Sequence, residues 1–283
     1  MDASIIIVSW NVKPFLEKCL ASIFRETQSI SYEVIIIDNA STDGSRELLK
    51  NSKFQIPNSK FIFNDRNFGF AGAVNQGLKI ARGEFIILLN PDTEILNKAI
   101  NKTVDFMCQN SRCAILGGRI LNSDGAVQSS VRSFPTLLSQ ILILFKLHNF
   151  LPRLKPLTDY FLWNFDYLKT QLVEQITGAF LAIRAKAIKD IGGFDEKFFL
   201  WFEEVDFCRR VKQAGWEVIY TPNICLRHYG ARSFSQLPPL TKQREFNRSL
   251  LYYFKKHHSR KDYYILYLLQ PISLFFSFHS SNI

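Results

Sequence analysis

The sequence lacks the closely spaced cysteine pairs that would indicate disulfide bonds or a metal site. Its five cysteines are an odd number and include no Cys-x-x-Cys pair of the kind found in zinc sites and redox motifs. Disulfide frameworks are typical of small secreted proteins. The composition therefore favours reduced thiols in the cytosol over disulfides or a zinc site. Residues 1–4, MDAS, lead into an apolar run without a basic segment, so we expect no signal peptide.

Glycine-rich phosphate loops are missing from the places where they would be diagnostic. SWNVKPFLEK, which follows the first apolar run, has no glycine, whereas a sugar-1-phosphate nucleotidyltransferase would need a glycine-rich basic loop there. No Gly-x-Gly-x-x-Gly follows a predicted strand, and GFAGAVNQG has its glycines at other spacings. The sequence therefore argues against a nucleotidyltransferase and against an NAD-dependent oxidoreductase.

No apolar run reaches the roughly 20 residues that a membrane-spanning helix needs. Residues 263–278, YYILYLLQPISLFFSF, are interrupted by Gln270 and Pro271, and residues 137–151 are equally short. Much of the net charge of +10 lies in residues 227–262, where nine Lys or Arg accompany two acidic residues. A basic segment before an aromatic tail favours an anionic membrane surface. The alternative is a C-terminal helix packed on the core. No nucleic-acid-binding motif is present.

The sequence does contain the pattern of a large α/β domain. Its 283 residues, 47% hydrophobic and 21% charged, can bury a full core. The predicted strands are 4–9, 33–38, 60–64, 84–90, 178–184 and 217–222, and the predicted helices begin at Pro14 and cover 44–51, 70–81, 185–191 and 203–216. Residues 121–172 are less regular and are interpreted as an insertion or a loop-rich segment. The alternation indicates a doubly wound sheet, which binds ligands at the carboxyl ends of its strands.

Polar or aromatic side chains follow four of these segments. Trp10, Asp38, Asn67 and Asp92 are therefore expected at one edge of the sheet. Asp92 either caps a helix beginning near Thr93 or holds a divalent cation, because a buried carboxylate needs compensation. Asp38 either stabilises the turn in DNASTDG or binds a nucleobase that stacks on Trp10.

A cluster of acids follows a mostly aromatic run in FLWFEEVDF. On a helix, Glu203 and Asp206 share a face, while Glu204 lies about 100° around. These acids either complement the helix dipole or include a general base whose pKa is raised by apolar walls. His228 is either structural or a divalent-metal ligand that would complement Asp92.

Together these stretches resemble the family 2 inverting glycosyltransferases with the GT-A fold, and within them the rhamnosyltransferase-like branch. The resemblance covers about residues 3–235 in five blocks, which are SIIIVSWN (4–11), IIIDNASTDGS (35–45), the block from NFGFAG to NPDTE (67–94), the block from TGAFLA to IYTPN (177–223) and RHYG (227–230). It implies a Rossmann-like, mainly parallel sheet flanked by helices, followed by a C-terminal helical tail.

The resemblance also implies roles for individual residues. The nucleotide-sugar donor would be bound by Ser9, Trp10, Asn11, Asp38, Asn67 and Asp92. Asp92 and His228 would hold Mg²⁺ or Mn²⁺ at the donor diphosphate. Glu204 would be the catalytic base, with Glu203 as the other candidate, and Asp206 would support the acceptor site.

Two departures from the family pattern affect these roles. The Asp-x-Asp motif is Asn90-Pro91-Asp92 here, so metal binding would depend more on the diphosphate. The Asp expected as the base is Glu204, which is one methylene longer. The choice between Glu203 and Glu204 therefore stays open.

The function implied is transfer of a sugar from a nucleotide-sugar to a hydroxyl of a cell-surface glycan or lipid-linked acceptor, with rhamnose from dTDP-rhamnose as the first hypothesis. The transferase domain would span residues 1–238, with the donor half at about 1–120 and the acceptor half at about 121–238. Residues 239–283 would form the tail. We expect a cytoplasmic protein, peripheral on the inner face of the plasma membrane, with no nucleic-acid partner. The alternative is a catalytically inactive nucleotide-binding relative that acts at a membrane surface.

Overall fold

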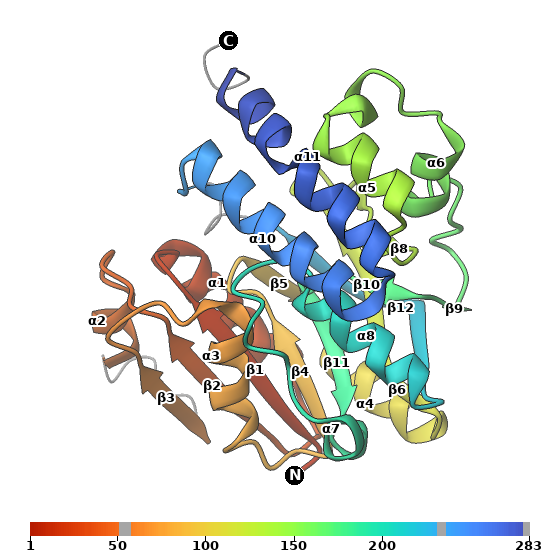
Figure 1. The fold of residues 1–283 in the computed structure, drawn as a ribbon. Helices are drawn as coiled ribbons and strands as arrows, with labels where there is room; N and C mark the ends of the chain where they lie inside the picture. Colours follow the sequence, from red (N-terminus) through yellow and green to blue (C-terminus); the bar gives the residue numbers. More distant parts are fainter. Residues whose placement is uncertain (51–57, 231–235, 280–283) are drawn as a thin grey trace.

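The computed structural model describes residues 1–50, 58–230 and 236–279. Helices cover both faces of one mixed β-sheet (Figure 1). The strand order is β3-β2-β1-β4-β11-β6-β12-β5, with β7 beside β6 and β9 beside β12. Strands β8 and β10 form a separate pair. The predicted α/β class is confirmed.

One half of the sheet is parallel and comes from the apolar runs of the N-terminal region. Its strands are β3 (Ser59–Phe63), β2 (Tyr32–Asp38), β1 (Ala3–Ser9) and β4 (Phe85–Leu89). Strand β1 pairs with β2 in parallel from Ala3 opposite Tyr32 to Ser9 opposite Asp38. These two strands therefore deliver their carboxyl ends to the same edge.

The other half of the sheet is mixed. It contains β11 (Phe180–Arg184), β6 (Cys113–Leu121), β12 (Glu217–His228) and β5 (Thr93–Leu96). Strand β11 is antiparallel to both β4 and β6, and β12 is parallel to β6 and antiparallel to β5. After the parallel half, the chain adds further strands to the same sheet in both directions.

Two predictions about this half are wrong. The strand expected at 217–222 does not end at Pro222, because β12 continues to His228 through a shift of register between Thr221 and Cys225. A bulge at this point accommodates a proline, which cannot donate to the sheet. The helix considered near Thr93 is β5, so Asp92 does not cap a helix there.

The helices form two layers. On one face lie α1 (Lys13–Glu26), α2 (Ser45–Lys50) and α4 (Ala99–Gln109), and on the other lie α3 (Gly69–Leu78), α7 (Ala185–Ile191) and α8 (Glu203–Gln213). Helix α1 has proline in its first turn and buries Leu16, Leu20 and Ile23 at helical spacing. The predicted helices are confirmed within a few residues, although residue 51 of the predicted segment 44–51 lies outside the described residues.

The segment 121–172 has more regular structure than expected. It contains β7 (Val127–Gln128), β8 (Val131–Arg132), α5 (Leu137–Leu144), the 3-10 helix η2 (Leu147–Asn149), α6 (Lys155–Phe161) and β9 (Gln171–Leu172), and β10 (Gln175–Ile176) follows it. The apolar run 137–151 is not one helix, because Lys146 takes a φ of 55° after α5. Such a left-handed residue ends the helix.

The C-terminal residues form two helices that lie side by side, α10 (Pro239–His257) and α11 (Arg260–His279) (Figure 1). Leu250, Tyr253 and Phe254 of α10 are buried in an apolar cluster with Leu266 of α11. The C-terminal helical tail is therefore packed on the core, as in the alternative interpretation. Across the described residues, no helix is long and apolar enough to cross a bilayer. The division at residue 238 stays a prediction.

Candidate donor and catalytic site

The carboxyl ends of β1 and β2 bring four of the predicted residues to one edge of the sheet. Ser9 and Asp38 are neighbours in the paired strands and are both fully buried. Trp10 and Asn11 follow Ser9 directly. Asn11 takes a left-handed φ of 53°, and its Oδ1 accepts a hydrogen bond from Thr42 N at 2.7 Å. The turn after β1 is thereby tied to the loop after β2.

One oxygen of the Asp38 carboxylate is occupied within the protein. Its Oδ1 accepts hydrogen bonds from Arg46 Nε at 2.6 Å and from Ser41 N at 3.1 Å, which shows the turn role considered from the sequence. Asp38 Oδ2 and the neighbouring Ser9 Oγ are buried and have no hydrogen-bond partner within the described residues. Buried polar atoms without partners are costly. Their missing partners mark Ser9 and Asp38 as candidate contacts for a ligand that carries hydrogen-bonding groups.

Asn67 belongs to a network of side-chain amides behind this edge. Asn39 Nδ2 donates to Asn67 Oδ1 at 2.8 Å and to Gly69 O at 3.1 Å. Asn39 Oδ1 accepts from Asn64 Nδ2 at 3.1 Å and from Phe68 N at 3.0 Å. The sequence interpretation missed Asn39 and Asn64. Their position directly after two strands was the available signal.

Asp92 and His228 meet across two antiparallel strands. The register of β5 and β12 sets Thr93 opposite His228, and Nε2 of His228 lies 3.2 Å from Oδ1 of Asp92. Nδ1 of His228 lies 2.9 Å from Oε1 of Gln128 on β7. Because that oxygen is an acceptor, Nδ1 carries a proton and donates it to the hydrogen bond. No pattern in the sequence pointed to Gln128.

This pair fits a divalent cation. With Nδ1 directed at Gln128, Nε2 is the ring nitrogen that could bind a cation, and it lies 3.2 Å from Oδ1 of Asp92, a spacing that suits a shared ion. Two ligands at about 2.1 Å on neighbouring corners of an octahedral ion are about 3 Å apart. In the described residues no three His, Cys, Asp or Glu side chains gather into one metal site. Most of the remaining coordination positions of an ion at Asp92 and His228 would fall to substrate oxygens and water.

Glu203 and Glu204 begin helix α8 immediately after a strained turn. Trp201 and Phe202 both take left-handed φ values, 63° and 67°. Such values cost about 1–3 kcal/mol per residue and cluster at functional sites. Glu203 is buried and Glu204 is half-buried, and each has an Oε2 atom with no hydrogen-bond partner in the described part of the chain.

The two carboxyl groups have unequal proton affinity. Burial and the charge of Glu204 raise the pKa of Glu203 well above its ordinary value. Burial also raises the pKa of Glu204, but backbone N–H groups at the start of α8 and the charge of Arg132 oppose this rise. Hydrogen bonding between the two side chains raises the pKa of Glu203 and lowers that of Glu204. The pKa of both groups is raised, that of Glu203 further, so Glu204 is the member of the pair that loses its proton first and can act as a base.

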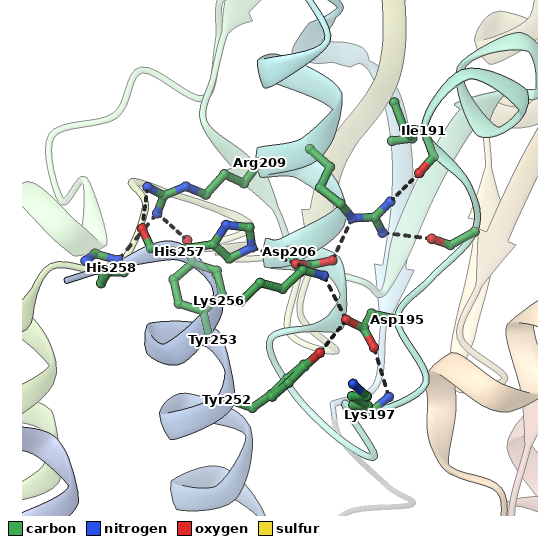
Figure 2. A network of polar contacts seen from close by, with 12 residues as sticks. Ile191, Asp195, Lys197, Asp206, Arg209, Tyr252, Tyr253, Lys256, His257 and His258 are labelled. Carbon is green, nitrogen blue, oxygen red and sulfur yellow. Dashed lines mark hydrogen bonds and ion pairs between the residues drawn. The ribbon is translucent and has the colours of Figure 1, made fainter. Parts of the chain in front are cut away.

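Asp206 has different surroundings from the glutamates. It is fully buried, and its carboxylate contacts Lys256 at 2.7 Å and His257 at 2.6 Å (Figure 2). Arg210 Nε lies 2.8 Å from the same carboxylate. Burial alone would raise its pKa, but the hydrogen bonds from His257 and Lys256 and the charge of Arg210 lower it to about 2. Asp206 is therefore ionised and bound to the C-terminal helix α10. The sequence predicted no function for His257.

The aromatic run before α8 is joined to the candidate donor edge, by which we mean the carboxyl ends of β1 and β2 and the loop that carries Asn67. Phe70 N, in α3, donates to the carbonyl of Phe199 at 3.0 Å. Gly69 has a φ of +74°, and a Cβ built on it would lie 2.5 Å from that carbonyl oxygen. Only glycine allows this close approach. The loop with Asn67 and the segment that leads to Glu203 are thus held together.

The architecture is that of the GT-A glycosyltransferases. A mannosyltransferase from Pyrobaculum calidifontis in complex with GDP-Man and Mn²⁺ is similar over 97% of this chain and 72% of its own, with 14% identity and a TM-score of 0.61. Residues 1–349 of S. aureus TarS in complex with UDP are similar over 88% of this chain and 64% of their own, with 17% identity and a TM-score of 0.55. At these identities the likeness concerns the fold.

The family follows from the sequence comparison. The model of glycosyl transferase family 2 matches residues 4–184, so the chain belongs to this family. An N-acetylglucosaminyl-diphospho-decaprenol L-rhamnosyltransferase of Mycobacterium tuberculosis is 29% identical over 251 residues, which cover 83% of this chain and 78% of the relative. A low-salt glycan biosynthesis hexosyltransferase of Haloferax volcanii is 26% identical over 75% of this chain and 62% of its own length.

Proposed function

We propose that this glycosyltransferase is a metal-dependent inverting enzyme that transfers a hexose from a nucleotide-sugar to an acceptor hydroxyl, with Glu204 as base. The observation that carries the proposal is the pair of carboxyl groups at the start of α8, the buried Glu203 and the half-buried Glu204, each with an Oε2 atom that has no hydrogen-bond partner within the described residues. The pair begins a helix whose preceding segment contacts α3 at the donor edge. A base next to a donor site is what activation of a hydroxyl requires.

The reaction is a single displacement. Glu204 takes the proton of the acceptor hydroxyl while the oxygen of that hydroxyl forms a bond to the anomeric carbon of the donor sugar. The bond from that carbon to the diphosphate breaks on the opposite face, and its electron pair leaves with the nucleoside diphosphate. One displacement gives inversion. Glu203 stays protonated during the displacement. Asp206, which lies on the same helix α8, supports the acceptor side.

The donor side uses the edge of the parallel strands. Asp38 Oδ2 and Ser9 Oγ, which have no hydrogen-bond partner within the described residues, would bind the nucleobase or ribose, and Trp10, Asn11 and Asn67 would contribute to the same site. Asp92 and His228 would hold Mg²⁺ or Mn²⁺ against the diphosphate. When bound, such an ion neutralises the charge that develops on the leaving group.

We further propose L-rhamnose from dTDP-rhamnose as the donor sugar and a lipid-linked saccharide of a cell-surface glycan as the acceptor. The support is the similarity to the Mycobacterium tuberculosis relative, whose name states L-rhamnosyl transfer to N-acetylglucosaminyl-diphospho-decaprenol. Turnover with a panel of nucleotide-sugars assigns the sugar.

The test is donor turnover. The full chain is incubated with a panel of nucleotide-sugars and Mg²⁺ or Mn²⁺, with and without EDTA, and release of nucleoside diphosphate is measured with and without a lipid-linked acceptor. We expect metal-dependent release from one donor, dTDP-rhamnose first. Nucleotide binding without turnover in any combination would instead support the alternative, an inactive nucleotide-binding relative at a membrane surface.

We also propose that the protein is cytoplasmic and binds the inner face of an anionic membrane through α11. The support is a row of exposed apolar side chains on this helix, Tyr264, Tyr267, Leu268 and Ile272, which follows the exposed basic residues Arg260 and Lys261 at the start of the helix. Sedimentation with vesicles of anionic or neutral lipids tests this. We expect Leu268→Ser to weaken binding to anionic vesicles, and equal binding by the parent and the variant would refute it.

A further inference from the structure

Helix α10 contacts the segment that carries the proposed base both before and after it. Before the base, the buried Ser249 Oγ donates a hydrogen bond to the carbonyl of Leu200 at 2.7 Å. Phe246 contacts the rings of both Trp201 and Phe202, with centroids 6.0 and 5.5 Å apart. The two left-handed residues are therefore covered by α10.

After the base, α10 holds the first turn of α8. Lys256 Nζ lies 2.7 Å from Asp206 Oδ1 and 2.8 Å from Asp195 Oδ2, so one cation bridges α8 and the loop that precedes the aromatic run (Figure 2). His257 Nε2 lies 2.6 Å from the same Asp206 oxygen. Asp206 N in turn donates to the carbonyl of Phe202 at 2.8 Å, which closes the first turn.

We propose that α10 is a brace that positions Glu203 and Glu204, with Ser249 and Lys256 as positioning residues. The inference rests on the proposed function, because it assumes that this pair supplies the base. Strained residues persist only where their surroundings over-determine them. Here part of the surroundings comes from α10, a separate helix later in the chain, and both α10 and the strained turn lie beyond residues 4–184.

The charges packed around Asp206 show why the brace is specific. Arg210 comes from α8 itself, whereas Lys256 and His257 come from α10, and all three contact the Asp206 carboxylate. Without the contacts from α10, the contact with Arg210 would be the one of these three that remains at the Asp206 carboxylate. The turn at 200–202 would at the same time lose the support that Ser249 gives to Leu200.

The experiment compares two neutralised lysines on the same helix of the full-length protein. Lys256→Met removes both carboxylate contacts, whereas Lys255→Met removes the same charge from an exposed residue with no ion pair in the described chain. We expect Lys256→Met to lower kcat about tenfold or more with the donor KM within twofold, because misplacing a catalytic group by about 1 Å can cost about 100-fold. Lys256→Arg should restore most of the rate.

Thermal unfolding of each variant is measured first, and rates are compared per folded molecule well below each midpoint. Ser249→Ala, which removes the other contact without changing charge, should lower kcat in the same way. Rates for Lys256→Met and Ser249→Ala within twofold of Lys255→Met would overturn the brace, even if both variants unfold at lower temperature.

Hydrogen–deuterium exchange separates this inference from the proposed function. We expect faster exchange of residues 200–206 in Lys256→Met than in Lys255→Met, with residues 4–9 unchanged. If the parent shows no turnover with any donor, the proposed function fails, while this exchange still decides whether α10 holds the segment. Equal exchange in the two variants would refute the brace.

Discussion

Nε2 of His228 lies 3.2 Å from Oδ1 of Asp92, and the opposite nitrogen of the imidazole is held by Gln128 at 2.9 Å. Two backbone features produce this relationship. Asp92 directly precedes β5, and the register with β12 sets His228 opposite Thr93. The hydrogen bond with Gln128 fixes the ring and leaves Nε2 to face the carboxylate. Such outer partners orient metal-binding histidines.

The first prediction concerns metal use. Asp92→Asn and His228→Ala should each lower metal-dependent turnover about 100-fold, because each removes a ligand from a pair that has few protein ligands to begin with. Calorimetric titration of Mn²⁺ in the presence of a nucleoside diphosphate should show weaker binding in both variants. Asp105→Asn removes a carboxylate from the exposed face of α4 and is the matched control. Full metal-dependent activity in Asp92→Asn would contradict the assignment.

The sequence predicted the parallel half of the fold well, because its strands are continuous apolar runs with polar residues directly after them. Ser9 and Asp38 could be placed at one edge for this reason, and the structure shows them as neighbours. The bulge at Pro222 was not predictable, because proline usually ends a strand and only the pairing with β6 shows that β12 resumes.

Contacts between residues that are distant in the sequence could not be predicted either. Lys256 and His257 look like a basic surface run, and only the packing of α10 on α8 brings them to Asp206. The sequence placed Asp206 and Glu203 on one helical face, but it could not show that the pKa of Asp206 is lowered while that of Glu203 is raised. This difference depends on which partners each carboxylate meets.

The second prediction separates the two glutamates. Glu204→Gln should lower kcat by about 100-fold or more, because it removes the group that accepts the proton of the acceptor. Glu203→Gln should cost less, since an amide at this position can still donate a hydrogen bond to Glu204. Rates at saturating donor and acceptor measure both. The opposite order of effects would identify Glu203 as the base.

The third prediction is the pH dependence of the rate. Burial raises the pKa of Glu204 above its ordinary 4.5, and the base must be ionised to act. The acidic limb of a plot of kcat/KM against pH should therefore be centred above 4.5, with the rate rising as pH increases through it. Glu203→Gln, which removes the neighbouring carboxylate, should move this limb. A limb at or below 4.5 in the parent would contradict a buried base.

The fourth prediction concerns stability and pH. The folded state raises the pKa of Glu203, so the stability contributed by its protonated form is present below about pH 4.5 and is lost as pH rises through the folded pKa. Glu203→Gln removes this loss. The variant should unfold at a temperature a few degrees higher than the parent at pH 8, with the difference vanishing near pH 4. A midpoint at pH 8 no higher than that of the parent would show that burial of this carboxyl is not costly.

The fifth prediction concerns the junction between the donor edge and the aromatic run. Gly69→Ala forces a side chain into a left-handed residue and toward the carbonyl of Phe199, where a Cβ would lie 2.5 Å away. The free energy of unfolding should fall by about 1–3 kcal/mol. The donor KM should also rise, because Asn39 bonds both Gly69 O and the side chain of Asn67.

Gly178→Ala is the control, since a Cβ there meets nothing within 4 Å and its φ is not left-handed. If both variants unfold alike in urea, the close approach of Gly69 to Phe199 does not contribute to stability. If Gly69→Ala is less stable but keeps the parent donor KM, the junction supports the fold without shaping the donor edge.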